Sequence, residues 1–300
     1  SATLTADFGE YTPVLKGLTA KAMFSYDYRA DNNEAFRKEY YQYAYDEQTG
    51  TYKQKVYNES SPSNMRREFY DKSQMLGQFT VNYDRTFNDV HHVGGVIGWE
   101  VQKRNGDNFY AVRDLAFSMP YLLAGVTEGQ IGAMQTGNND LYEQANEALI
   151  GRINYSFADR YLLTATIRRD GSSKFAKNNR WGWFPSAALA WKASNETFLK
   201  DNPIINNLKI RLGWGTTGNQ NVQDWAYIAL LATKNTPWGN GVLNGNTANP
   251  DLKWETTYST NLGLDLNLFD NRIEFIADFY YKKTKDMLLQ VALPAFLGSS

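Results

Sequence analysis

Few side chains in this sequence are placed where they could do chemistry. His91 and His92 are adjacent, so in a strand they point to opposite faces and cannot share one metal ion. Asp265 and Glu274 could face each other across a hairpin as a glycosidase pair would, but a solvated polar surface explains them better. The sequence contains no P-loop, no G-x-S-x-G, no G-x-G-x-x-G and no cysteine. We therefore predict no catalytic residues, no metal site and no cofactor.

Aromatic side chains in the polar connections offer a second kind of chemistry, which is stacking on a ligand. Aromatic residues make up 15% of the chain, a content that suits both carbohydrate stacking and the aromatic girdles of membrane barrels. The candidates for substrate contact are Tyr110, Tyr142, Trp225 and Trp238. For each of them, packing within its own loop is the competing and favoured interpretation.

Long alternating strands would have to position these residues. Between residues 255 and 268 the apolar residues fall on one side and the polar residues on the other, and the same alternation returns in 273–282 after a corner at 269–272. Strands in globular proteins usually run about 5–6 residues, whereas crossing a membrane takes about 9–11 tilted residues. This stretch therefore predicts a transmembrane β-hairpin, with Leu262, Leu264 and Leu266 facing lipid.

The rest of the chain repeats this pattern, giving about nine or ten spanning strands. Short corners at 87–89, 157–160 and 269–272 alternate with long connections at 30–63, 104–142, 171–180 and 216–250. We expect a hairpin at 41–57 within the first connection, and a bulge or local irregularity at Pro185. The predicted fold is all-β: an antiparallel transmembrane β-barrel segment with short periplasmic turns and long extracellular loops.

Composition agrees with a barrel and excludes other classes. A mean hydropathy of -0.54 is polar, and no apolar run approaches the ~18 residues of a membrane helix, but barrel strands turn half their side chains to a polar lumen. The net charge of -1 predicts no nucleic-acid partner. An open sheet leaves backbone groups unpaired in lipid, so we expect strands outside this sequence to close the barrel. The sequence also begins without Met and stops within an apparent loop, as a piece of a longer protein would.

Several segments of the sequence form recognisable motifs. The most specific is Asn249, Pro250, Asp251, Leu252, Lys253, Trp254 and Glu255. The others are IRRDGSSKF at 167–175, TGNQ at 217–220, WFPS at 183–186, YKKTKDML at 281–288 and LKGL at 15–18. Together these segments resemble the SusC/RagA family of TonB-linked (TonB-dependent) outer-membrane transporters of Bacteroidetes. For the first of these segments, which lies where a long loop meets a strand, we predict a structural corner rather than a ligand contact.

The resemblance implies a 22-stranded barrel around an N-terminal plug, with a TonB box facing the periplasm. It also implies a SusD-like surface lipoprotein as lid, outer-membrane lipid around the barrel, and import of oligosaccharides or peptides with energy passed through the TonB complex. This sequence shows neither a plug-like region nor a TonB box. Residues 1–300 are therefore expected to be a partial TonB-dependent receptor β-barrel domain, located in the bacterial outer membrane and without enzymatic activity.

Two other hypotheses stay open at the level of sequence. A passive porin would share the strand pattern, although the family segments argue against it. A soluble β-rich glycan-binding module or glycosidase would suit the aromatic content, and it predicts that Leu262, Leu264 and Leu266 lie in a dry protein core.

Overall fold

The computed structural model describes residues 1–135, 140–200, 202–245 and 247–289, nearly all of them in strands and connections. The expected loop at the end of the sequence, 290–300, lies outside the described residues. Within the described ranges, no helix is long and apolar enough to cross a membrane.

The strands are β1 (Ala2–Asp7), β2 (Leu18–Arg37), β3 (Tyr41–Asp46), β4 (Thr51–Val56), β5 (Asn64–Phe87), β6 (His91–Asp114), β7 (Ile131–Ala133), β8 (Tyr142–Phe157), β9 (Tyr161–Ser172), β10 (Trp181–Lys192), β11 (Ile205–Asn219), β12 (Leu231–Thr236), β13 (Gly239–Asn244), β14 (Glu255–Leu268) and β15 (Ile273–Lys285). The helices are short 3-10 turns: η1 (Phe8–Glu10), η2 (Pro13–Leu15), η3 (Asn58–Ser60), η4 (Leu122–Ala124) and η5 (Ala193–Asn195).

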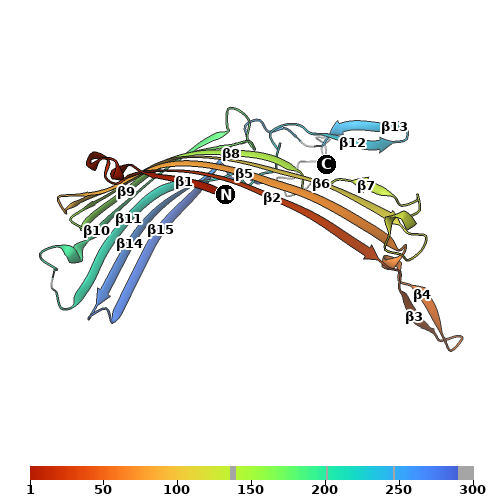
Figure 1. The fold of residues 1–300 in the computed structure, drawn as a ribbon. Coiled ribbons are helices and arrows are strands. Elements are labelled where there is room, and N and C mark those ends of the chain that lie inside the picture. The colour runs from red at the N-terminus through yellow and green to blue at the C-terminus, as the bar shows by residue number, and fades with distance from the viewer. Residues whose placement is uncertain (136–139, 201, 246, 290–300) are drawn as a thin grey trace. The chain divides into compact units, whose positions relative to one another are not determined.

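The main sheet follows the order of the chain. Its strands run β1-β2-β5-β6-β8-β9-β10-β11-β14-β15, with β7 added at β6, and Figure 1 shows β9, β10, β11, β14 and β15 side by side. Every pair with a defined register is antiparallel. This agrees with the about nine or ten spanning strands predicted from the alternation.

The described chain divides into two compact units. The first contains residues 1–25, 75–103 and 144–300, and the second contains 26–74 and 104–143. The second unit includes the hairpin β3–β4, which confirms the hairpin expected at 41–57. The first unit carries the short corners and the strands that contain the family-like segments of β9, β10, β11 and β14.

The short corners turn through left-handed backbone. At the corner between β5 and β6, Asn88 and Asp89 both have φ near +50°, and the Val90 N–H donates to the Phe87 carbonyl at 3.1 Å. The corners at 157–160 and 269–272 close in the same way. Two successive positive φ values match the right-handed twist of the flanking strands, and Asn and Asp tolerate them well. The three corners predicted from sequence are confirmed.

The two faces of the first unit differ sharply in character. On the apolar face of β14 and β15, Leu262 lies opposite Phe279 and Leu266 opposite Phe275. Leu262 is 54% exposed and Phe279 is 81% exposed, so neither side chain is buried in a protein core. A soluble protein rarely leaves so large a contiguous apolar face uncovered. Among the residues that the structure describes, no dry core surrounds Leu262, as the soluble alternative required.

The polar face is joined by ion pairs across strands. Arg211 on β11 donates from Nε and Nη2 to both carboxylate oxygens of Asp265 on β14, at 2.9 and 2.7 Å. Its Nη1 lies 3.1 Å from Oδ1 of Asp278 on β15. Asp265 is therefore paired with Arg211, while Glu274 lies opposite Asn267. The direct carboxylate pair of Asp265 and Glu274 considered from sequence is wrong.

Several sequence-based expectations also need correction. Strand β2 continues to Arg37, so the connection predicted at 30–63 is shorter. Strand β6 continues to Asp114, so Tyr110 lies in a strand and the connection predicted at 104–142 is also shorter. Hairpin β12–β13 occupies part of the connection predicted at 216–250. The bulge or irregularity expected at Pro185 does not affect the pairing of β10 with β9, which runs without a register shift and places Pro185 opposite Ile167. The pairing of β10 with β11 begins only at Ser186, so Pro185 lies just outside that ladder. The missing proline N–H therefore does not disturb the ladder.

Candidate functional site: a polar hollow on the inward face

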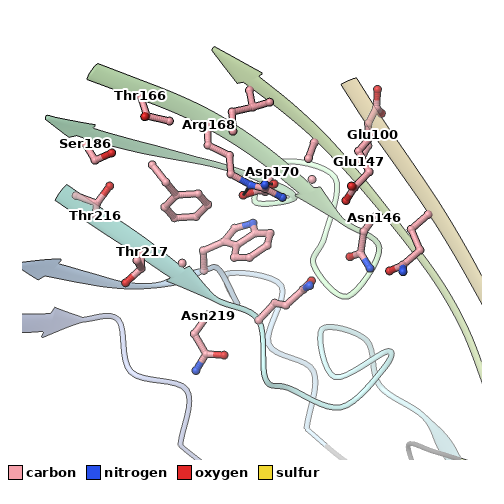
Figure 2. Close-up of a pocket in the computed structure, with 18 of the residues that line it drawn as sticks. Glu100, Asn146, Glu147, Thr166, Arg168, Asp170, Ser186, Thr216, Thr217 and Asn219 are labelled. Atoms are coloured by element: carbon pink, nitrogen blue, oxygen red, sulfur yellow. Dashed lines mark hydrogen bonds and ion pairs between the residues drawn. The ribbon is translucent and has the colours of Figure 1, made fainter. Parts of the chain in front are cut away.

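A hollow of about 620 Å³ lies on the polar face of the first unit. Strands β6, β8, β9, β10 and β11 all contribute to its wall, together with the residue after β11 and Trp254 before β14. Figure 2 shows Thr166, Arg168 and Asp170 along one strand, with Thr216, Thr217 and Asn219 along another. Because strands alternate their side chains between faces, one strand can supply polar groups here and apolar groups on its opposite face.

The wall of the hollow carries both charges and neutral polar groups. Arg168 donates from Nε to both oxygens of Asp170 at 2.8 Å. Arg152 donates from Nε to the Thr166 hydroxyl at 3.1 Å. Glu100 accepts a hydrogen bond from the Gln78 amide. A wall of this kind offers donors and acceptors in many directions, while Arg168 and Asp170 neutralise each other's charge.

A buried aromatic cluster lies beside the hollow. Phe175, Phe184 and Trp254 are buried, and the Trp254 ring centroid lies 5.3 Å from that of Phe175 and 5.4 Å from that of Phe184. The Trp254 indole N–H donates to the Arg180 carbonyl at 2.9 Å. Leu252 and Val222 pack around these rings. The cluster joins three connections at one end of the strands and fixes the shape of the hollow.

The segment Asn249–Glu255 is built as a corner. The Leu252 N–H donates to the Asn249 carbonyl at 3.2 Å, closing a turn with Pro250 at its second position, where proline is favoured. Asn179 donates to the Pro250 carbonyl at 3.2 Å, so the neighbouring connection is tied to the same turn.

The two ends of this segment are tied down by polar contacts. The Glu255 carboxylate accepts from the Asn219 amide at 3.1 Å and from the Leu288 N–H at 3.0 Å. Lys253 Nζ lies 3.1 Å from Asp286 Oδ1. Asp251 is exposed. These contacts support the structural corner predicted for this segment.

The four candidate substrate aromatics do not form one site. In the second unit, the Arg66 guanidinium lies 3.9 Å from the Tyr110 ring centroid, and that of Arg104 lies 5.6 Å from the Tyr142 ring centroid. In the first unit, Trp225 pairs with the Tyr227 ring, whereas Trp238 is 94% exposed at the turn of β12–β13. Local packing therefore engages three of them, and their role in binding substrate stays a prediction.

Sequence reasoning missed a polar contact that holds the connection after β11. Lys174 donates to the Val222 carbonyl at 2.9 Å, and its Nζ lies 3.8 Å from Asp224 Oδ1. The amide of Gln144 donates to both oxygens of Asp224, at 3.1 and 3.0 Å. The paired residues are 48 to 80 positions apart, so only the strand order could have brought them together.

The two histidines behave as expected from their adjacency. His91 Nδ1 lies 2.8 Å from the Tyr155 hydroxyl, while His92 Nδ1 lies 3.2 Å from the Thr86 hydroxyl. Each ring is thus engaged with a different neighbour. In the part of the chain that the structure describes, no group of three His, Cys, Asp or Glu residues is arranged to hold a metal ion.

Comparison with known proteins decides the family. The family model described as TonB dependent receptor-like, beta-barrel, matches residues 3–300. The chain belongs to this family. It is 47% identical over 152 residues to the TonB-dependent receptor SusC of Bacteroides thetaiotaomicron, covering 48% of this chain and 15% of that protein. It is 38% identical over 226 residues to TonB-dependent receptor P39 of Formosa agariphila, covering 73% of this chain and 21% of that protein.

Solved structures agree with the TonB-dependent receptor assignment. The RagAB peptide transporter superposes with a TM-score of 0.78 at 26% identity, over 94% of this chain and 30% of that one. The SusC/RagA resemblance found in the sequence is confirmed. The chain spans 15–23% of the length of the curated relatives that it matches.

Membership of the TonB-dependent receptor family shows what each of the two faces contacts. The chain is a segment of an outer-membrane β-barrel, so the apolar face contacts lipid and the polar face lines the lumen. Barrels of this kind place their short turns on the periplasmic side and their long loops outside the cell. The corners at 87–90, 157–160 and 269–272 are therefore periplasmic, and the corner at Asn249–Glu255 lies at the extracellular end.

Proposed function

We propose that this chain forms part of the lumen wall of an outer-membrane importer that takes up oligosaccharides or peptides. Energy would reach the complete protein from the TonB complex, and a SusD-like surface lipoprotein would act as its lid. The wall itself makes and breaks no bonds. Its contribution is a rigid, polar surface along which a hydrated solute or a plug can lie.

The observation that carries this proposal is the polar hollow on the lumen face. Its wall presents the Arg168–Asp170 pair and several hydroxyl and amide groups beside the Trp254 ring. Groups of these types bind the hydroxyls of a sugar or the amides of a peptide equally well. The hollow therefore fits a solute-conducting barrel without distinguishing between the two substrate classes.

A solved relative supports peptide import, and the exposed aromatic rings of this chain support oligosaccharide import. RagAB is described as a peptide transporter, and this chain shares its fold over 94% of its length. Exposed aromatic rings such as Trp238 suit stacking on sugars. The extracellular connections within 104–142 and 216–250 would contact a lipoprotein or a substrate.

The two rival functions are disfavoured for different reasons. A soluble glycan-binding module or glycosidase would bury the apolar face, yet Leu262 and Phe279 stand exposed on it. A passive porin would share this face, but the chain belongs to the TonB-dependent receptor family. Neither alternative accounts for both observations.

Uptake by cells that carry the complete protein tests the proposal. Labelled oligosaccharides and labelled peptides of similar size are offered to cells with and without a functional TonB. We expect uptake of one class, and its loss when TonB is removed. Uptake that persists without TonB would indicate a porin, and recovery of the protein from the soluble fraction without detergent would indicate the soluble module.

A further inference from the structure

An arginine lies between two tryptophans on the lipid-facing side of the barrel. Arg169 on β9 lies opposite Trp183 on β10, and Trp181 lies opposite Gly171, so all three side chains share the apolar face. The Arg169 guanidinium carbon lies 4.1 Å from the Trp181 ring centroid and 5.4 Å from that of Trp183. Both distances are within the range of cation–π attraction.

The charge of Arg169 is not neutralised within the described chain. Arg169 forms no ion pair with any described residue, and its buried Nε–H meets no hydrogen-bond acceptor there. Its partner in register on β8 is Leu149, an apolar residue. The carboxylate of Glu147, which lies opposite Gly171 on the same face, does not pair with Arg169. It accepts a hydrogen bond from the Trp99 indole at 2.9 Å. A guanidinium stacked on rings keeps its donors in its own plane, where a bidentate oxygen acceptor can reach them.

The position of Arg169 along β9 places it at the outer edge of the lipid. The strand starts at Tyr161 beside the periplasmic corner, where Trp191 lies opposite, and Leu163 and Ile167 follow on the same face. Eight residues at about 3.3 Å each, tilted by about 40°, put Arg169 roughly 20 Å above Tyr161, close to the ~25 Å height of an apolar barrel band. Tyr161 and Trp191 thus belong to the periplasmic girdle, and Trp181 and Trp183 to the extracellular girdle.

A similar pairing occurs elsewhere at this end of the apolar face. Lys285 on β15 lies opposite Thr256, with its Nζ 5.2 Å from the Tyr258 ring centroid. Cations on aromatic rings therefore recur where the lipid-facing surface meets the outside. The guanidinium of Arg169, unpaired at the outer edge of the apolar band, would be stabilised by an anion that is anchored in the lipid.

We propose that Arg169, held between Trp181 and Trp183, binds the phosphoryl group of a phosphorylated lipid in the outer leaflet. The phosphate oxygens accept hydrogen bonds from the in-plane guanidinium donors, and the two indoles pack against the sugar or acyl part of the same lipid. The apolar residues below, Leu149 and Ile167, contact its chains. The occupant is a lipid, because Arg169 stands on the lipid-facing side, away from the lumen through which free anions pass.

Native mass spectrometry of the complete protein in detergent tests this site. The probes are bis-phosphorylated lipid A and the same lipid with its phosphates removed. Removing an Arg–phosphate hydrogen bond costs about 1.5–3 kcal/mol, so Arg169→Gln should lower retention of the bis-phosphorylated lipid by about tenfold to a hundredfold. Arg169→Lys keeps the charge but loses the planar donors, and it should retain an intermediate amount.

A matched control and a folding check make the result decisive. Arg272→Gln removes the same charge at a periplasmic corner and should leave retention unchanged. Heat-modifiable migration on gels shows whether each variant is a folded barrel, and if Arg169→Gln fails to fold then Arg169→Lys decides. Equal retention by the folded Arg169 variants and wild type would overturn the proposal. So would equal retention of the dephosphorylated lipid, or complete displacement by inorganic phosphate alone, which would indicate a site for free anions.

Discussion

Arg211 reaches across β14 to Asp278 because Gly263 leaves the space between them empty. A Cβ atom added at Gly263 would lie 2.6 Å from Arg211 Cζ and 2.7 Å from Asp278 Oδ1. Three adjacent strands, β11, β14 and β15, are thereby linked on the lumen face by one guanidinium. The glycine is required for the space that it leaves rather than for its backbone freedom.

The first prediction concerns this glycine. Gly263→Ala should force Arg211 and Asp278 apart and destabilise the barrel by about 1–3 kcal/mol, the usual cost of overpacking. Gly213→Ala on β11 is the control, because its added methyl group would meet only Asn261 Cβ at 4.0 Å. Urea unfolding of the complete protein in detergent measures both, and equal losses would contradict this account.

The second prediction concerns the corner between β8 and β9. Ala158 has φ of +51°, a conformation that costs a non-glycine residue roughly 1–2 kcal/mol. Asn at the equivalent place in the first corner, Asn88, adopts the same φ and is better suited to it. Ala158→Asn should therefore stabilise the barrel by about 0.5–1 kcal/mol, seen as a higher unfolding midpoint. A lower midpoint would show that the left-handed backbone is not a source of strain here.

The third prediction concerns Glu196, on the periplasmic connection between β10 and β11. It accepts hydrogen bonds from the Tyr161 hydroxyl at 2.6 Å, from Arg160 Nη1 at 2.8 Å and from the Trp191 indole at 3.2 Å. These donors, Tyr161 foremost, lower the pKa of Glu196 below its usual value near 4.5.

The pH dependence follows from the direction of that shift. A carboxyl group whose pKa is lower in the folded state stabilises the fold fully above pH 4.5, and the contribution disappears as the pH falls through the folded-state pKa. Glu196→Gln should lower the unfolding midpoint at neutral pH and flatten its decline below pH 4.5. Tyr161→Phe should weaken the same decline in part. An unchanged acid profile in both variants would exclude Glu196 as its origin.

The fourth prediction concerns Trp254 in the family-like segment. Trp254→Ala removes the centre of the aromatic cluster and the bond to the Arg180 carbonyl, and should cost about 3–5 kcal/mol. Trp238→Ala is the matched control, since that ring is 94% exposed and its loss should stay within about 0.5 kcal/mol. If Trp254→Ala were harmless to stability but abolished uptake, the segment would be a ligand site and not a corner.

The fifth prediction tests the membrane face. Leu264→Arg places a charge near the middle of the lipid-facing band and should destabilise the barrel by about 2–4 kcal/mol. Asn261→Arg on the lumen face of the same strand should cost less than about 1 kcal/mol. Unfolding from liposomes measures both, and a reversed order would mean that the two faces have been exchanged.

The two faces of the strands and the short corners could be predicted from the sequence because both depend on residues that are close together in the chain. Alternation alone assigns Leu262 and Asn261 to opposite faces of the sheet. The dipeptide Asn88-Asp89 predicts a tight turn by its residue types. The extension of β6 to Asp114 escaped prediction because residues 104–108 are polar on both faces. The soluble alternative could be set aside only when the exposure of the apolar face was known.

The lumen site depends instead on strand order and register. The hollow draws on strands from β6 to β11, and nothing in the spacing of Glu100 and Asn219 predicts that both line it. The contact of Lys174 with Asp224 is equally distant in sequence. Gly263 shows the same limit, since its role is visible only once Arg211 and Asp278 are known to flank it.

The three short corners share one side of the membrane, and this makes the orientation of the chain irreversible. Turning the inserted segment over would drag every long polar connection through hydrocarbon, with several kcal/mol lost for each backbone group stripped of water. No thermal fluctuation supplies that energy. The sides of the membrane on which the short corners and the long connections lie are therefore fixed at the moment of insertion.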